Sequence, residues 1–198
     1  LAVIGTGKRA RDLREFRDRL HEVHPGCIYH HFWGVMLRPQ FESPEFLNDF
    51  ADWASHGLHD KALAESLAVI DPAEFPNTED LRAELINVME DRLDRDEGAL
   101  WERSLKPFYF LRSQIVVFQT HITLEHPRQL ATVVPELSVG SIFYHFIDAR
   151  RRDHHATDDF RAWLTSYDAQ YKDLCEGIGQ IDPYFASLRE LRDELARL

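Results

Sequence analysis

Residues 26–32 read Gly-Cys-Ile-Tyr-His-His-Phe, and residues 140–146 read Gly-Ser-Ile-Phe-Tyr-His-Phe. The glycine, the isoleucine, the second histidine and the last phenylalanine are the same in both stretches. In the first stretch Ile28, Tyr29 and Phe32 recur at the spacing of one helix face, and the second stretch keeps that spacing. The two stretches therefore predict the same helix, used twice.

Three further pairs of short stretches follow in the same order along the chain. They are Asp-Phe-x-x-Trp at 49–53 and 159–163, Ile-Asp-Pro at 70–72 and 181–183, and Leu-Arg-x-Glu-Leu at 81–85 and 191–195. All four pairs are separated by 110 to 114 residues. Amphipathic helices alone do not require matched Trp, His and Asp-Pro positions. The sequence therefore predicts an internal duplication.

Each copy is predicted to hold one strand and four helices. The strands are expected at 1–6 and 114–120, because both stretches are short and rich in strand-forming residues. Amphipathic helices are expected to follow at about 10–23 and 127–135. Since a lone strand is not stable, we expect the two strands to pair about a pseudo-two-fold axis. The predicted fold is mainly α with a small central β-sheet, in the α+β class.

The predicted boundaries are 1–93 for the first repeat, 94–106 for a linker and 107–198 for the second repeat. The halves are expected to be intertwined or tightly docked. Apolar residues begin at Phe108 in the second copy, and the matching positions of the first copy fall before Leu1. We therefore expect the N-terminal strand to be truncated in this sequence.

Four residues are predicted to cap helices. Ser43, followed by Pro44, is expected to start a helix that runs to about Ser55, and Ser138, Asn77 and Ser187 are expected at three other helix starts. Asp71 and Asp182, each before a proline, are expected to cap turns through their own side chains.

Composition excludes several classes of protein. The formal net charge is −11 and the isoelectric point is about 5.4, which argues against a protein that coats nucleic acid or binds an anionic membrane surface. No apolar run approaches the roughly 20 residues that span a bilayer.

Two isolated cysteines, Cys27 and Cys175, are typical of reduced cytosolic thiols. Phosphate-loop, dinucleotide-binding and nucleophile-elbow motifs are also absent.

Several of these stretches together resemble a bacterial and archaeal family that carries a domain of unknown function. They are Tyr-x-His-Phe-Trp-Gly at 29–34, Asn-Asp-Phe-Ala-x-Trp at 48–53, Ile-Asp-Pro at 70–72 and the second-copy stretch 141–150. The resemblance covers nearly the whole chain. It implies no established activity. It does imply an accessory role beside enzymes that transfer glycosyl groups in sugar or osmolyte metabolism.

His31 and His145 are the leading candidates for a binding site, since they hold the same place at the edge of the duplicated helix's apolar arc. Tyr29, Tyr144, Trp33 and Trp53 are predicted beside them, as rings that stack on a ligand. The structural alternative is that both histidines bridge the helix to a neighbouring loop and that the aromatic rings are core.

An alternative site is the stretch His56-Gly57-Leu58-His59-Asp60. If the helix continues, His56, His59 and Asp60 share one face and can hold a divalent metal, and the His-Asp pair resembles the metal-binding dyad of HD-type phosphohydrolases. Gly57 favours the opposite outcome, a break in the helix. A second cluster, Arg150 to Arg152 with His154 and His155, is interpreted as a solvated helix end or as a phosphate site.

The sequence therefore predicts a cytosolic, non-catalytic accessory protein, either a monomer or a homodimer. It is expected to bind a small molecule or a protein partner between its halves, near His31 and His145, and no cofactor is predicted. The alternative is a metal-dependent phosphohydrolase that uses His56, His59 and Asp60.

Overall fold

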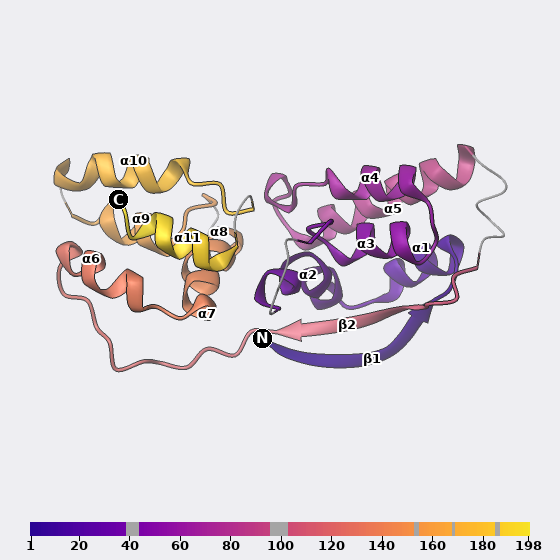
Figure 1. Cartoon of the computed structure of the whole chain (residues 1–198), viewed down its shortest axis with the longest axis horizontal. Coiled ribbons are helices and arrows are strands. Elements are labelled where there is room, and N and C mark those ends of the chain that lie inside the picture. The colour runs from indigo at the N-terminus through magenta and orange to yellow at the C-terminus, as the bar shows by residue number, and fades with distance from the viewer. Residues whose placement is uncertain (39–43, 96–102, 153–154, 168, 185–186) are drawn as a thin grey trace. The chain divides into compact units, whose positions relative to one another are not determined.

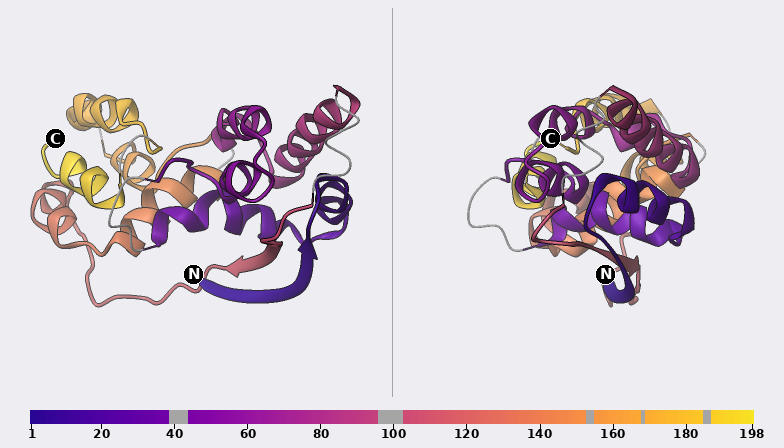
Figure 2. Two further views of the ribbon diagram at one scale, coloured as in Figure 1. Left: turned by 45° about the vertical axis from the view of Figure 1, so that its right-hand side comes forward. Right: turned by 90° about the vertical axis from the view of Figure 1, so that its right-hand side faces the viewer.

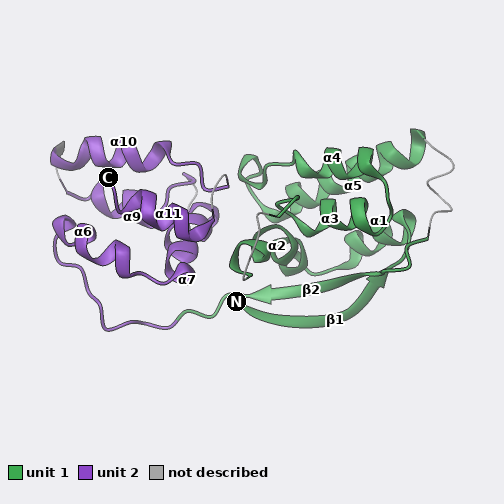
Figure 3. Cartoon of the chain, viewed as in Figure 1, with its two compact units in different colours: residues 1–117 green, residues 118–198 purple. Residues whose placement is uncertain are grey.

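The computed structural model describes residues 1–38, 44–95, 103–152, 155–167, 169–184 and 187–198. The chain forms two compact units, residues 1–117 and residues 118–198 (Figure 3). Both units are mainly helical, and a small antiparallel sheet belongs to the first, which confirms the predicted α+β class.

Unit 1 holds five α-helices and two strands among its described residues (Figure 1). In chain order they are β1 (Ala2–Ala10), α1 (Leu13–Glu22), α2 (Pro25–Trp33), η1 (Gly34–Leu37), α3 (Asp49–His56), α4 (Lys61–Ala68), η2 (Pro72–Glu74), α5 (Thr78–Arg95) and β2 (Phe108–Gln114).

The sheet consists of β1 and β2 in antiparallel register, and the two strands run together in both views of Figure 2. The register shifts between Gly5 and Arg9. Gly7 lies inside this irregularity with φ of 73°, a left-handed conformation that glycine adopts without steric cost. The two strands therefore pair with each other, as predicted, but both belong to unit 1 and not one to each half.

The second strand lies earlier than the sequence predicted. Its expected range was 114–120, but β2 ends at Gln114, which pairs with Ala2 near the start of β1. Residues 115–118 have no strand opposite them among the described residues. Their high strand propensity did not decide the position, because Phe108 and Phe110 are the residues that the core buries.

An aromatic cluster forms the core of unit 1. Phe16 on α1 lies 4.8 Å from Trp53 on α3 and 4.7 Å from Phe108 on β2, measured between ring centres. Phe50 and Phe110 complete the cluster, each within 6 Å of Phe108. The cluster joins a helix near the N-terminus to a strand about a hundred residues later, and so β2 is held against the helices of unit 1.

Unit 2 is built from short helices. They are η4 (Pro127–Gln129), α6 (Leu130–Val133), η5 (Val134–Glu136), α7 (Val139–Ile142), η6 (Phe143–Asp148), α8 (Ala149–Arg152), α9 (Asp159–Leu164), η7 (Ala169–Tyr171), α10 (Lys172–Gln180) and α11 (Leu188–Leu195). Among the described residues of the whole chain, no helix combines the length and the apolar character needed to cross a membrane.

Two contacts are repeated at matching positions of the two units, buried in unit 1 and partly buried in unit 2. The Arg82 guanidinium donates to the Val23 carbonyl (2.7 Å), and Arg192 donates to the Leu137 carbonyl (3.3 Å). Both carbonyls lie directly after the helix that precedes the repeated stretch of 26–32 and 140–146. The Leu-Arg repeat in the sequence thus carries the same helix-capping function in both units.

The repeated Ile-Asp-Pro stretches also make the same turn. Asp71 Oδ1 accepts a hydrogen bond from the Ala73 N–H, and Asp182 Oδ1 accepts one from the Tyr184 N–H, both at 2.8 Å. The prediction that these aspartates cap turns is confirmed.

Helix starts were predicted with mixed success. Ser138 and Ser187 are N-caps, and Asn77 Oδ1 accepts from the first backbone N–H groups of α5, as predicted. Ser43 lies outside the described residues. The helix expected to begin at Pro44 begins instead at Asp49, because the Asn48 side chain accepts the Ala51 N–H and caps it there.

The predicted repeat boundaries do not coincide with the compact units. Residues 108–117 fall in the predicted second repeat but pack with unit 1. Of the predicted linker 94–106, residues 96–102 lie outside the described part of the chain.

Gly57 is required by its contact with Trp53. A Cβ atom at Gly57 would clash with Trp53 Cδ1 and would lie 2.7 Å from the Trp53 carbonyl oxygen. We therefore expect Gly57→Ala to lower the free energy of unfolding by about 1–3 kcal/mol, as an overpacking substitution does. Urea denaturation measures the loss. Gly5→Ala is the control, because its Cβ would meet no atom within 4 Å. Equal losses in the two variants would contradict this account.

Candidate functional site

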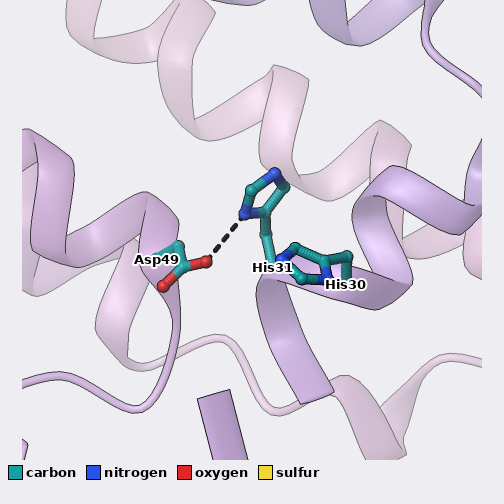
Figure 4. Close-up of side chains that lie close together, drawn as sticks. All are labelled: His30, His31 and Asp49. Atoms are coloured by element: carbon teal, nitrogen blue, oxygen red, sulfur yellow. Dashed lines mark hydrogen bonds and ion pairs between the residues drawn. The ribbon is translucent and has the colours of Figure 1, made fainter. Parts of the chain in front are cut away.

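His31 lies at the centre of unit 1 with both ring nitrogens engaged. Its Nδ1 lies 2.7 Å from Asp49 Oδ2, and its Nε2 accepts a hydrogen bond from the Leu111 N–H at 3.0 Å. Because Nε2 accepts, the single proton of the neutral ring is on Nδ1 and is donated to Asp49. Figure 4 shows the ring turned toward that carboxylate. Burial lowers the pKa of His31, although Asp49 acts in the opposite direction, and the ring is neutral.

Asp49 receives two further hydrogen bonds from Arg38. The guanidinium donates to Oδ1 at 2.8 Å and to Oδ2 at 2.7 Å, in the bidentate geometry that arginine makes with carboxylates. Burial raises the pKa of Asp49, but the hydrogen bonds from His31 and Arg38 outweigh it and hold the pKa below its ordinary value. The carboxylate is therefore ionised and accepts three hydrogen bonds from its two neighbours.

His30 is also neutral. Its Nε2 lies 3.4 Å from the Arg38 guanidinium, which can only donate, and its Nδ1 lies 2.6 Å from Ser113 Oγ. Nε2 therefore accepts, and Nδ1–H donates to the serine. Burial, followed by the neighbouring His31 and Arg38, lowers the pKa of His30 to about 4.

These side chains line an open depression of about 440 Å³ on unit 1. Its walls are Val3, His30, His31, Arg38, Asp49, Asp52, Trp53, Pro107, Phe108, Tyr109 and Leu111. Asp52 and Tyr109 are exposed, and Arg38 keeps nearly half of its side chain accessible. The depression thus offers a carboxylate, a guanidinium and a phenol ring side by side.

Two of the predicted ring residues lie away from this depression. Tyr29 and Trp33 are buried on α2, where their rings stack with centres 5.1 Å apart. Trp53 does line the depression, but it is buried and its Nε1–H donates to the Lys106 carbonyl at 2.7 Å. The three rings are core residues, and Tyr109 is the exposed ring that sequence reasoning missed.

His30, His31 and Asp49 form a group whose possible metal-ligand atoms all lie within 4.8 Å of one another. Their present hydrogen bonds oppose a metal ion. A metal on His31 Nδ1 would displace the proton there, and the neutral ring would then carry its proton on Nε2, facing the Leu111 N–H. The same ion would also have to displace Arg38 from Asp49.

Unit 2 contains the same combination of side chains. His145 Nδ1 lies 2.8 Å from Asp159 Oδ2, and Arg152 donates to that oxygen at 3.1 Å. The guanidinium also stacks over the Tyr144 ring, 4.2 Å from its centre. Burial raises the pKa of Asp159, but hydrogen bonds from His145 and Arg152 outweigh it and lower the pKa.

The two combinations differ in exposure. The His31 side chain is 3% accessible, whereas the His145 side chain is 44% accessible. His145 also lies on η6, a six-residue π-helix, a rare conformation that is frequent at functional sites. The other basic residues of this region face acids, since Arg151 bonds to Asp148 and Arg150 lies 3.7 Å from Asp158.

The residues of the predicted alternative metal site are separated by a break in the helix. α3 ends at His56, His59 has φ of 60° in the turn, and Asp60 is the N-cap of α4. The expectation that they share one helix face is therefore wrong, because Gly57 ends the helix. Asp60 accepts hydrogen bonds from the Leu63 N–H (3.0 Å) and from Arg92 (2.6 Å). His56 is exposed beside Asp52 and Glu45.

Sequence reasoning passed over Arg38 as a site residue, and it interpreted Arg152 as part of a helix end or phosphate site and not as a partner of His145. Each lies seven positions after its histidine, so the two arginines have the same 114-residue separation as the two histidines. This shared spacing from histidine to arginine is the sequence signal that could have identified the two arginines as equivalent.

We expect His31→Ala to lower the free energy of unfolding by about 3 kcal/mol, because it removes a buried ring that bonds to both the Leu111 N–H and Asp49. His145→Ala is the matched control. The accessible hydrogen bond between His145 and Asp159 should contribute at most about 1 kcal/mol. Chemical denaturation of both variants measures the difference, and similar losses would contradict the assigned role of His31.

Comparison with known proteins places the chain in a family. A solved structure, "The structure of OrfY from Thermoproteus tenax", superposes with a TM-score of 0.81 at 28% sequence identity, over 99% of this chain and 88% of that one. No curated protein matches the chain. The family model described as "Family of unknown function (DUF5752)" matches residues 1–198, and the chain therefore belongs to that family.

Proposed function

We propose that this chain is a cytosolic, non-catalytic accessory protein that binds a small, uncharged polar molecule in the depression of unit 1. One observation carries the proposal: the groups there that could transfer protons are already engaged with one another. Both histidines are neutral with their ring nitrogens hydrogen-bonded, and Asp49 is held by Arg38 and His31. Such a site is suited to recognition rather than to acid–base catalysis.

The side chains that remain accessible define the ligand chemistry. Asp49 neutralises Arg38, so the depression offers no excess positive charge to an anion. Asp52 offers hydrogen-bond acceptors, Arg38 offers donors, and the Tyr109 ring offers an apolar face. A molecule that carries hydroxyl groups around an apolar ring face, such as a neutral sugar, matches this combination. The implied context of sugar or osmolyte metabolism agrees with it.

We further propose that the two units arose by duplication. The repeated His–Asp–Arg combination, the repeated Asp-Pro turn and the repeated contacts of Arg82 and Arg192 support this origin. In unit 2, His145 corresponds to His31 and Tyr144 corresponds to His30, and the His145 side chain is 44% accessible.

Calorimetric titration with a panel of neutral mono- and disaccharides tests the binding proposal. We expect at least one of them to bind, and we expect Tyr109→Ala and Asp52→Asn each to weaken its binding about tenfold through loss of stacking or of a hydrogen bond. Tyr171→Ala is the control, because it removes a half-buried tyrosine of unit 2. Failure of every sugar to bind, or equal losses in Tyr109→Ala and Tyr171→Ala, would contradict the proposal.

The alternative function is a metal-dependent phosphohydrolase that uses His56, His59 and Asp60. It requires Asp60 to leave Arg92 and the Leu63 N–H in order to bind a metal. Titration with Zn²⁺ or Mn²⁺ distinguishes the two functions. Stoichiometric metal binding that is lost in His59→Ala and kept in His30→Ala would favour the hydrolase.

A further inference from the structure

In unit 1, the chain segment 106–111 covers the helices and satisfies two of their side chains through its backbone. The Lys106 carbonyl accepts the Trp53 Nε1–H at 2.7 Å, and the Leu111 N–H donates to His31 Nε2 at 3.0 Å. Between these two bonds, Phe108 packs on Phe50, with ring centres 5.6 Å apart. One extended segment thus covers a histidine, a phenylalanine and a tryptophan.

Unit 2 carries the same three side chains at the matching positions, His145, Phe160 and Trp163. Asp159 orients His145 through Nδ1, as Asp49 orients His31. Within the part of unit 2 that the structure describes, no group hydrogen-bonds to His145 Nε2 or to Trp163 Nε1. His145 and Trp163 are more accessible than their buried counterparts in unit 1, whereas Phe160, like Phe50, is buried. We call these three residues the open face of unit 2.

The chain also contains an extended segment that resembles the occupant of the covered face. Residues 115–118 read Ile-Val-Val-Phe, and they follow β2 without a strand partner among the described residues. Val116 is 50% accessible, Val117 56% and Phe118 81%. Large apolar side chains exposed next to one another are typical of an interaction surface.

Each copy of the chain carries both the open face and the exposed segment, and the charge distribution permits two copies to meet at them. Two copies with a net charge of −11 repel each other unless they meet at uncharged surfaces. From residue 113 to residue 124 the chain contains no Asp, Glu, Lys or Arg. This segment therefore adds no charge repulsion of its own when it approaches another copy.

We propose that the open face of unit 2 binds the segment 115–118 of a second copy, so that the protein is a two-fold symmetric homodimer. A backbone N–H of the incoming segment donates to His145 Nε2, and a backbone carbonyl accepts the Trp163 Nε1–H, as segment 106–111 does in unit 1. Each copy gives one segment and receives one, so the contact forms twice and the assembly closes. Main-chain bonds to an extended segment are a general mode of peptide recognition.

Sedimentation velocity of the full chain over about 1–200 µM tests the proposal, and the wild type is expected to be a dimer in this range. We expect Phe118→Asp and Trp163→Phe each to raise the dissociation constant at least about tenfold. The control is Val69→Asp, because Val69 is 81% accessible, like Phe118, but lies at the end of α4. Its dissociation constant should equal that of the wild type. Circular dichroism verifies that each variant is folded.

A wild type that is monomeric throughout this range would overturn the proposal, and so would a dimer that Phe118→Asp leaves intact. Sugar binding in unit 1 is measured separately and does not affect this test.

Discussion

The neutral His31 ring joins three parts of unit 1 that are distant in sequence. It stands on α2, donates to Asp49 at the start of α3, and accepts from the backbone of Leu111 on β2. The His31 ring is buried and both bonds are partly buried, so a polar group that loses its partner there costs free energy. One tautomer of the His31 ring therefore connects β2 to the start of α3. Through Asp49, it also connects both to Arg38.

The same bond between histidine and aspartate recurs in unit 2 in a different setting. His31 and Asp49 lie beneath β2, whereas His145 and Asp159 are accessible. The same combination of side chains is thus more accessible in unit 2 than in unit 1. Unit 1 keeps an accessible depression beside its buried ring, where Arg38 and nearby side chains contact solvent.

Sequence reasoning found the repeated elements because they are local. The Asp-Pro turns and the serine caps follow from the chemistry of single side chains, and the repeat identified His31 and His145 as equivalent. The position of β2 depends on burial against distant helices, which strand propensity does not contain. Trp33 was expected beside a ligand but is a core residue, because its burial also depends on the packing of the folded chain. The role of Arg38 appears only when the fold brings it to Asp49.

The most direct test of this account is the protonation state of the His31 ring, observed by nitrogen-15 NMR and assigned from the spectrum of His31→Gln. The account predicts a proton on Nδ1, none on Nε2, and no change in either signal through pH 6.5, near which an unperturbed histidine is half-protonated. Burial lowers the pKa, so the neutral form persists below that pH. A proton on Nε2, or titration of the ring near pH 6.5, would contradict it.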